Sequence, residues 1–410
     1  MGIFRKIEES QTLLINNQSK NLEHQQKKIF KFGFGQSPFL PPKKVMDELK
    51  SNVHRKEYSS VQGDSELRQL ISNFHLQVNG LKVSADNIMI APGSKILIYT
   101  ILLAFKKADV FIPAPAWVSY APQAKLAGHN ILVVETSFNN RWRVTPESMM
   151  NAYTKKKHEV SIMILNYPGN PDGLTYTKEE VLQIAEKARE LDVLVISDEI
   201  YGLLTHKNKH HSFSNFYPEK TITTTGLSKW CGAGGWRLGV ALLYEGIEVE
   251  FKKALMGIAS ETYSCAATPI QMAAKIAYGN IEDSKKYAKR QCEILEEIGN
   301  YCYVQLVESD IKLHAPEGGF YLFPDFSNYS EKLHTYGIKT SEELCNRILS
   351  ETGVALLPGS AFGMNKKHLT ARISYVDFED PLQKEDFDFK KDCPKIIEGI
   401  QVLKNWLELL

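Results

Sequence analysis

The chain has 410 residues, of which 49 are basic and 48 acidic, so its formal net charge is +1. With 43% hydrophobic residues, its composition is globular and excludes a disordered or fibrous protein. The balanced charge provides no general attraction to nucleic acid or to anionic lipid, so neither is expected as a partner.

Membrane, secretory and disulfide signals are also weak. No apolar run approaches the roughly 20 residues of a membrane helix. The N-terminus, MGIFRKIEES, lacks the apolar stretch of a secretory signal, so a cytoplasmic location is expected. Six cysteines are scattered without a CxxC pair, and we therefore expect neither a disulfide framework nor a metal site.

Segments rich in β-branched and aliphatic residues alternate with helical segments, which is typical of a mostly parallel sheet wrapped by helices. Seven strands are predicted, at 87–90, 109–112, 131–135, 161–166, 192–197, 221–225 and 237–243. Helices are predicted at 65–78, 94–107, 116–127 and 178–191. Thr177, followed by Glu179 and Glu180, is the predicted N-cap of the last of these helices.

The pattern changes after about residue 280. A long charged helical stretch, Glu282 to Leu306, leads into shorter predicted strands around 319–323 and 369–375. A single hydrophobic core stops growing at roughly 250 to 300 residues, so two regions are expected. We predict a large domain over 43–280 and a smaller α/β domain formed by 1–42 and 281–410.

Polar motifs follow the predicted strands. In open α/β sheets, ligands bind beyond the carboxyl ends of the strands, so these motifs predict one site at one edge. They are PGSK at 92–95, PAPAW at 113–117, NYPGNPDG at 166–173, SDEIY at 197–201 and TGLSKW at 225–230.

The segment GLSKWCGAGGWRLG, residues 226–239, is the most specific motif. It resembles the lysine-attachment signature of class I and II aminotransferases, which are fold-type I enzymes dependent on pyridoxal 5'-phosphate (PLP). Short motifs in the family's order extend the resemblance from about Gly33 to Ser374. It implies ping-pong transfer of an amino group from an L-amino acid to a 2-oxo acid. Lys229 is then the lysine that holds PLP as a Schiff base and shuttles the proton. Its amine can form the Schiff base only when it is neutral.

The resemblance also implies residues that bind the cofactor's phosphate. Arg237 matches the arginine that clamps it, and a guanidinium can do so bidentately. Gly93 and Ser94 match the donors at a helix N-terminus that cradle it, and the small Ser228 leaves room for the cofactor. The family often has a serine where this chain has Gly226, so one phosphate donor is expected to be missing.

Four further residues match groups around the cofactor's ring. Asp198 matches the aspartate that pairs with the protonated pyridine nitrogen and sustains the electron sink. Tyr201 and Asn170 match the groups that hydrogen-bond the ring's 3' oxygen, and Trp117 matches the aromatic that stacks on the ring. A turn role for Asn170 and a core role for Trp117 are the alternatives.

Substrate and partner contacts follow from the same resemblance. Arg372, in TARISY, matches the arginine that grips the substrate's α-carboxylate, and Gly35 and Asn170 are further predicted substrate contacts. Lys95 matches a lysine that certain aspartate and prephenate aminotransferases pair with a distal carboxylate. A solvent-facing helix lysine is an equal alternative. Tyr58 opens a Y-x4-G-x2-ELR segment whose tyrosine reaches the neighbouring subunit's phosphate, which implies a homodimer with shared sites.

Three other classes of function compete with amino transfer. A dinucleotide-binding dehydrogenase is disfavoured because Pro38 and Arg237 stand where the two candidate G-x-G-x-x-G segments need their third glycine. A non-catalytic PLP-fold binding module is disfavoured by the presence of Lys229, Asp198 and Arg372. PLP-dependent C–S β-lyases and aminocyclopropane carboxylate synthases share the cofactor residues, so elimination stays open beside transamination.

Overall fold

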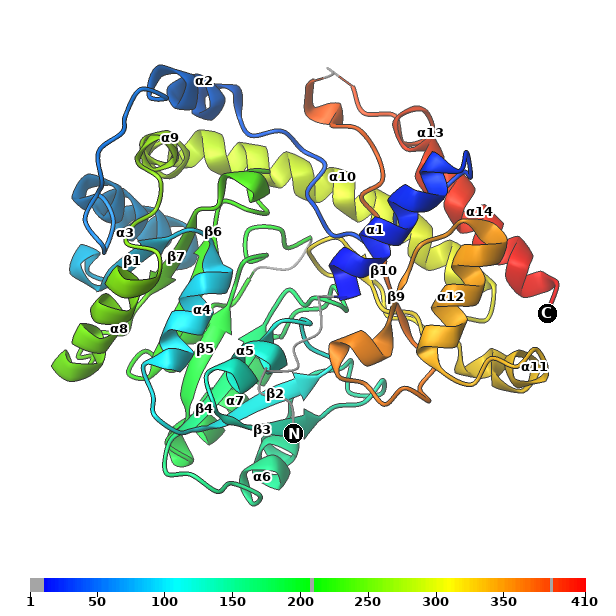
Figure 1. Ribbon diagram of the computed structural model, residues 1–410, viewed down its shortest axis with the longest axis horizontal. Coiled ribbons are helices and arrows are strands. Elements are labelled where there is room, and N and C mark those ends of the chain that lie inside the picture. The colour runs from blue at the N-terminus through cyan, green and yellow to red at the C-terminus, as the bar shows by residue number, and fades with distance from the viewer. Residues whose placement is uncertain (1–10, 207–209, 384–385) are drawn as a thin grey trace.

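The computed structural model describes residues 11–206, 210–383 and 386–410 and contains two β-sheets flanked by helices (Figure 1). The large sheet has seven strands in the order β1-β7-β6-β5-β4-β2-β3. Only β7 runs against its neighbours, β6 and β1, while the other pairs are parallel. The strands are β1 (Ile88–Ala91), β2 (Asp109–Ala114), β3 (Asn130–Glu135), β4 (Ser161–Asn166), β5 (Leu194–Asp198), β6 (Thr221–Gly226) and β7 (Gly239–Leu242).

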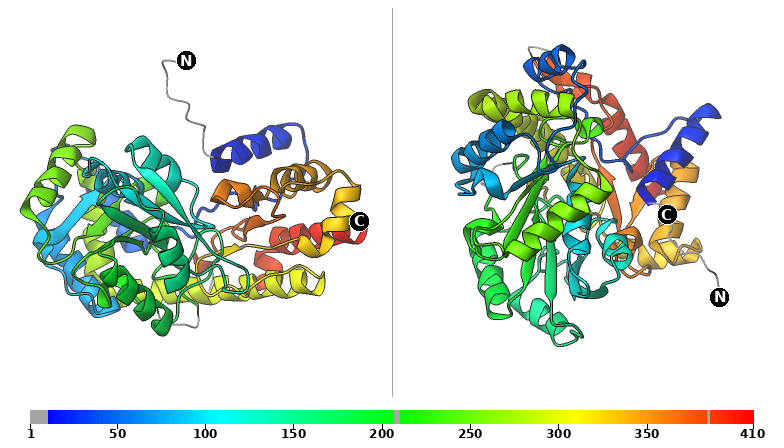
Figure 2. Two further views of the ribbon diagram at one scale, coloured as in Figure 1. Left: turned by 90° about the horizontal axis from the view of Figure 1, so that it is seen from below. Right: turned by 60° about the vertical axis from the view of Figure 1, so that its left-hand side comes forward.

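Helices cover both faces of the large sheet, so most of its strands are buried on both sides. Met89 belongs to a core cluster with α4 (Ser94–Leu103) and α8 (Val249–Thr262), and α5 (Tyr120–Leu126) packs on that same face. Its strand neighbour Ile90 points to the other face, in a cluster with α3 (Ser65–Asn79) and α9 (Thr268–Gly279). There α6 (Pro146–Tyr153) and α7 (Lys178–Glu190) cover the rest of the sheet. Figure 2 shows these layers from two sides.

The small sheet is antiparallel, with β8 (Tyr321–Leu322) and β9 (Leu357–Pro358) on either side of β10 (Ala371–Ser374). One core cluster contains side chains from both sheets, so the two are packed together. The long α10 (Ile281–Glu308) runs from the large sheet to the small one (Figure 1). The remaining helices are α1 (Gln11–His24), α2 (Lys43–Ser51), α11 (Ser330–Thr335), α12 (Ser341–Thr352), α13 (Phe389–Asp392) and α14 (Pro394–Glu408).

The predicted seven-stranded, mostly parallel sheet wrapped by helices is confirmed. Thr177 caps α7 as expected, with its hydroxyl accepting from Glu180 N at 3.2 Å. The domain limits at residues 42 and 280 stay a prediction, although the large sheet lies within 88–242 and the small one within 321–374. In the described part of the chain, no helix is long and apolar enough to span a membrane.

Several predicted element limits differ from those of the structure, and three of them are informative. The helix expected from residue 116 begins at Tyr120, because the backbone N–H of Ala116 instead donates to Phe362 O at 2.9 Å. The helix from Ser94 ends at Leu103, before the expected residue 107. The last strand begins at Gly239 because Arg237 has a left-handed backbone, with φ of +58°.

Candidate functional site

A cavity of about 380 Å³ lies at the carboxyl edge of the large sheet, where the N-terminal segment and the small sheet approach it. Of the residues predicted from the sequence, all but Gly93 and Tyr58 line it. The lining residues are Phe34, Gly35, Gln36, Ser94, Lys95, Trp117, Tyr120, Asn166, Asn170, Asp198, Ile200, Tyr201, Ser228, Lys229, Gly234, Gly235, Arg237, Tyr321 and Arg372.

The connection between β6 and β7 brings two cations to the cavity. Because β7 is antiparallel, the chain leaves and re-enters the sheet at one edge, and Leu227 N donates to Leu238 O at 3.1 Å to close the loop. Lys229 and Arg237 both lie on this loop. A side chain at Gly226 would put its Cβ 2.5 Å from Leu238 O, so this closure requires the glycine that the sequence has there.

Lys229 is held at the cavity wall. Its Nζ donates to Gly35 O at 2.8 Å and lies 5.3 Å from the ring centroid of Tyr201. Burial, with the neighbouring Arg372 and Arg237 cations, lowers the pKa of Lys229 to about 7, although Asp198 acts in the opposite direction. Its amine is therefore neutral in a substantial fraction of molecules near neutral pH, as a nucleophile or a base must be.

Asp198 ends β5 and is buried beneath the cavity. Its Oδ2 accepts a hydrogen bond from the Tyr120 hydroxyl at 2.7 Å, and its Oδ1 accepts one from Thr224 at 3.3 Å. Burial raises the pKa of Asp198 to about 6 despite these hydrogen bonds, which lower it. A cationic ligand group beside this carboxylate would favour its ionised form.

An anion site is formed where α4 begins. Gly93, with φ of +100°, precedes the helix, and no side chain caps the helix N-terminus. The left-handed backbone of Arg237 directs its guanidinium against Gly93, where any side chain would overlap it. Arg237 Nη1 donates to Gly234 O at 2.9 Å. Open backbone N–H groups and a guanidinium together favour a phosphate-like anion.

Arg372, on β10, is a buried cation without an acidic partner among the described residues. Its Nη1 donates to Asn170 Oδ1 at 2.8 Å and its Nη2 to Gly33 O at 2.6 Å. Its Nε has no partner within the described chain. An unpaired buried charge is costly, so this site is suited to a ligand carboxylate.

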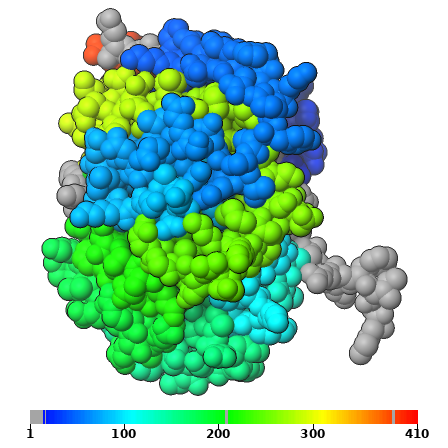
Figure 3. Space-filling model, turned by 90° about the vertical axis from the view of Figure 1, so that its left-hand side faces the viewer, coloured from blue at the N-terminus to red at the C-terminus, as the bar shows by residue number. Residues whose placement is uncertain are grey.

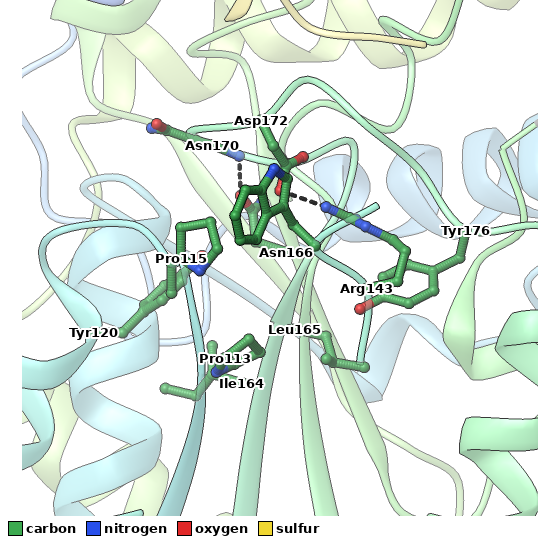
Figure 4. Close-up of a pocket in the computed structure, with 13 residues that line it drawn as sticks. Pro113, Pro115, Tyr120, Arg143, Ile164, Leu165, Asn166, Asn170, Asp172 and Tyr176 are labelled. Atoms are coloured by element: carbon green, nitrogen blue, oxygen red, sulfur yellow. Dashed lines mark hydrogen bonds and ion pairs between the residues drawn. The ribbon is translucent and has the colours of Figure 1, made fainter. Parts of the chain in front are cut away.

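Polar contacts hold the loop that carries Asn170 in place (Figure 4). Asn170 N donates to Asn166 Oδ1 at 2.8 Å, while Asp172 forms a buried ion pair with Arg143. Asp172 also accepts from Leu174 N at 2.8 Å. A small cavity of about 20 Å³ beside these groups has room for a single water. The loop geometry at Asn170 is therefore fixed by polar contacts on both sides.

Lys95 is an exposed residue whose ammonium group lies at the cavity, 5.4 Å from the ring centroid of Trp117. Partial burial of that group and the nearby Arg237 cation lower its pKa. No acidic side chain of the described residues forms an ion pair with it. Lys95 thus borders the cavity and is also exposed to solvent, so its role as a substrate contact stays a prediction beside the alternative of a solvent-facing helix lysine.

Two tyrosines of the cavity were missed by the sequence interpretation. Tyr120 donates to Asp198, and Tyr321 contacts the hydroxyl of Tyr201 at 2.7 Å. Tyr321 stands in the aromatic pair of GGFY, in a strand already predicted at the second sheet, and this pair was the available signal. Nothing in the sequence around Tyr120 distinguishes it from a core tyrosine.

Tyr58 does not reach the cavity of its own chain. It lies between α2 and α3 with 88% of its surface exposed. Figure 3 shows the face of the molecule on which these helices lie beside α8 and α9. A tyrosine this exposed is available to a neighbouring molecule.

Comparison with known sequences identifies relatives along almost the whole chain. Residues 27–380 match the family described as aminotransferase class I and II. The aspartate aminotransferase of Bacillus subtilis is 32% identical over 383 residues, which cover 91% of this chain and 93% of the relative. The asparagine–oxo-acid transaminase of Streptococcus mutans is 30% identical over 381 residues, covering 90% and 93%.

Solved structures with the same fold agree with these relatives. The aspartate aminotransferase of Thermus thermophilus with maleate has a TM-score of 0.85 at 24% identity, covering 98% of this chain and 100% of the other. The aromatic aminotransferase of Pyrococcus horikoshii has a TM-score of 0.81 at 26% identity, covering 95% and 98%.

Proposed function

The chain belongs to the class I and II aminotransferase family, whose members depend on PLP, and from this premise we propose how its own residues perform the transfer. With PLP bound, the reaction would proceed in two halves: an L-amino acid would be converted to its 2-oxo acid, and a second 2-oxo acid would then be converted to the product amino acid. The kinetics are accordingly ping-pong. Lys229 is the residue that binds the cofactor covalently and moves the substrate proton.

The residues present fit PLP at both of its ends. The uncapped N-terminus of α4 and the guanidinium of Arg237 provide donors and positive charge for a phosphate. Asp198 is buried and lines the same cavity, where it can pair with a protonated ring nitrogen. Trp117 lines the same cavity and supplies an aromatic face for the ring.

When bound, PLP supplies an aldehyde for an amine and a ring that withdraws electrons from the substrate's Cα. The residues of the chain orient the substrate and move its proton. Arg372 holds the substrate's α-carboxylate and so orients the Cα–H bond. The freed amine of Lys229, with its lowered pKa, takes the Cα proton as a base and returns it as an acid. Asp198, when ionised, would pair with the protonated ring nitrogen of bound PLP and so favour the ring's positive charge.

The observation that carries this proposal is the convergence of Lys229, Asp198, Arg237 and Arg372 on one cavity. A panel of amino donors against 2-oxo acid acceptors tests it, with both the oxo acid formed and the ammonia released measured for each pair. Amino transfer gives one oxo acid and one new amino acid per turnover, with no ammonia. Stoichiometric ammonia release would identify elimination by a C–S β-lyase or a related lyase and would contradict the proposal.

Acidic amino acids are the proposed better donors, because Lys95 presents an unpaired ammonium group to the cavity. Replacing Lys95 by alanine should lower kcat/KM for aspartate and glutamate by about 10-fold, a modest charged contact given its exposure. Neutral and aromatic donors should change far less. Single-turnover half-reactions with each donor measure the difference.

Lys125→Ala is the matched control, since it removes an exposed lysine from the neighbouring helix α5. It should leave all donors unchanged. Equal losses across all donors in Lys95→Ala would instead assign Lys95 to the cofactor or to stability.

A homodimer with shared sites is proposed from the exposed Tyr58. Two inactive variants, Tyr58→Ala and Lys229→Ala, are mixed under conditions of subunit exchange. Each mixed dimer has one site with both native residues, so about a quarter of all sites should recover. Assays before and after exchange measure the recovered activity.

Subunit exchange must be demonstrated separately, by mass spectrometry of differently tagged chains. Exchange without recovered activity would show that Tyr58 does not complete a neighbouring site. A mixture of Lys229→Ala with Lys229→Gln is the control, because no combination of those chains restores a site.

A further inference from the structure

The hydroxyl of Tyr321 joins the small sheet to the cofactor cavity. It lies 2.7 Å from the hydroxyl of Tyr201, which follows β5 of the large sheet. Both tyrosines are buried, and their rings meet edge to face at 5.6 Å. Burial raises the pKa of both, so the pair carries neutral hydroxyl groups in the physiological range.

The sheet register fixes the place of Tyr321. Tyr321 of β8 pairs with Ser374 of β10. Its side chain therefore lies on the same face of the small sheet as that of Arg372, which is two residues before Ser374. The Arg372 guanidinium lies 4.7 Å from the Tyr321 ring centroid. This cation–π contact holds the ring beside the proposed carboxylate site.

A second contact also restricts the position of the Tyr321 side chain. Its hydroxyl end packs against Gly35, where any Cβ would overlap it. Gly35 in turn accepts the hydrogen bond from Lys229. Tyr321 therefore lies between Arg372 and Gly35, and its hydroxyl is directed at Tyr201.

A phenol hydroxyl has one proton to donate and can accept another. The resemblance to the aminotransferases implies that Tyr201 donates its proton to the cofactor's ring oxygen, and in that state Tyr201 can only accept from Tyr321. We propose that Tyr321 is a positioning residue whose hydroxyl donates to Tyr201 and strengthens the hydrogen bond from Tyr201 to the ring oxygen. The inference rests on the proposed function, and hydrogen bonds in such a chain polarise one another.

The cofactor-loaded enzyme provides a readout that is independent of activity, the pH midpoint of its visible absorbance change. A donor to the ring oxygen stabilises its negative charge, and the proton shared with it is then lost at lower pH. Tyr321→Phe keeps the ring against Arg372 and Gly35 but removes the donor. Its midpoint should rise by about 0.5 pH unit, as expected for a neutral hydrogen bond acting through one residue.

The charged groups facing the pair are Lys229, Asp198 and Arg372, with Arg237 beyond them, and all are retained in this variant. Tyr201→Phe should raise the midpoint further than Tyr321→Phe. The double variant should match Tyr201→Phe alone, because Tyr321 acts only through Tyr201. Tyr375→Phe is the control, since it removes a nearby buried hydroxyl that has no partner in the described chain.

The outcomes separate the two proposals. An unchanged midpoint in Tyr321→Phe, or a double variant whose shift is the sum of the single shifts, overturns the positioning role while the cofactor chemistry stands. A shift in Tyr375→Phe as large as in Tyr321→Phe reduces the effect to general packing and also overturns it. A native protein that gains no visible band with PLP overturns the proposed function and this inference with it.

Discussion

Replacing Lys229 by alanine is expected to remove covalent cofactor attachment and to lower the amino-transfer rate by at least about 1000-fold, the scale of a lost general base. The remaining residues of the cavity are unaffected, so PLP should still bind through the phosphate site at Arg237. Borohydride reduction fixes the cofactor to its lysine in the native protein. Peptide mapping should then find the label on Lys229 and nowhere else.

A lysine elsewhere on the protein provides the comparison. Lys125→Ala should be labelled and active like the native protein, because that side chain lies outside the cavity. A pyridoxyl group on any lysine other than Lys229 in the native protein would remove the central assignment. Added methylamine, a small amine that can occupy the space of the missing side chain, should restore part of the half-reaction rate.

Asp198→Asn is expected to slow proton abstraction by about 100-fold while the cofactor stays attached to Lys229, since a charged hydrogen bond contributes about 1.5–3 kcal/mol. The amide keeps the shape of the side chain and can still meet the hydroxyls of Tyr120 and Thr224. It lacks the negative charge that keeps the cofactor's ring protonated. Stopped-flow half-reactions with a saturating donor measure the rate, and the visible spectrum reports cofactor occupancy.

Thr224→Val is the matched variant, because it removes one hydrogen bond to Asp198 but leaves the carboxylate. Its loss should be much smaller. Native half-reaction rates in Asp198→Asn, with full cofactor occupancy, would rule out the electron-sink role.

The parts of the fold that depend on local pattern were predictable. Each apolar strand of the large sheet is bounded by turn residues, and parallel strands direct their carboxyl ends to one edge. The positions of Lys229, Asp198 and Asn170 at one cavity follow from that geometry alone. Their roles came from the resemblance of the motifs and not from the spacing of the residues.

Contacts between distant segments were not predictable in the same way. Tyr321 and Tyr201 are 120 positions apart and meet because the chain just before β8 pairs with the chain that follows β5, at Gly318 and Thr205. The start of α5 was misplaced for the same reason, since a carbonyl at Phe362 decides where Ala116 donates. The left-handed backbone of Arg237, which directs its guanidinium against Gly93, is likewise not indicated by the residues around it in the sequence.

The reversed direction of β7 has a consequence for the order in which the molecule is completed. The proposed phosphate site needs Gly93 and Arg237 together, and they meet where Ala91 of β1 pairs with Gly239 of β7. A ribosome releases the start of α4 long before it releases β7, so the growing chain has only half of this site while residues 94–237 are being synthesised. Pairings between such distant segments form late, because closing the long loop costs entropy first. Cofactor capture should therefore follow sheet closure, and a nascent chain that stops before Gly239 has no complete phosphate site to offer.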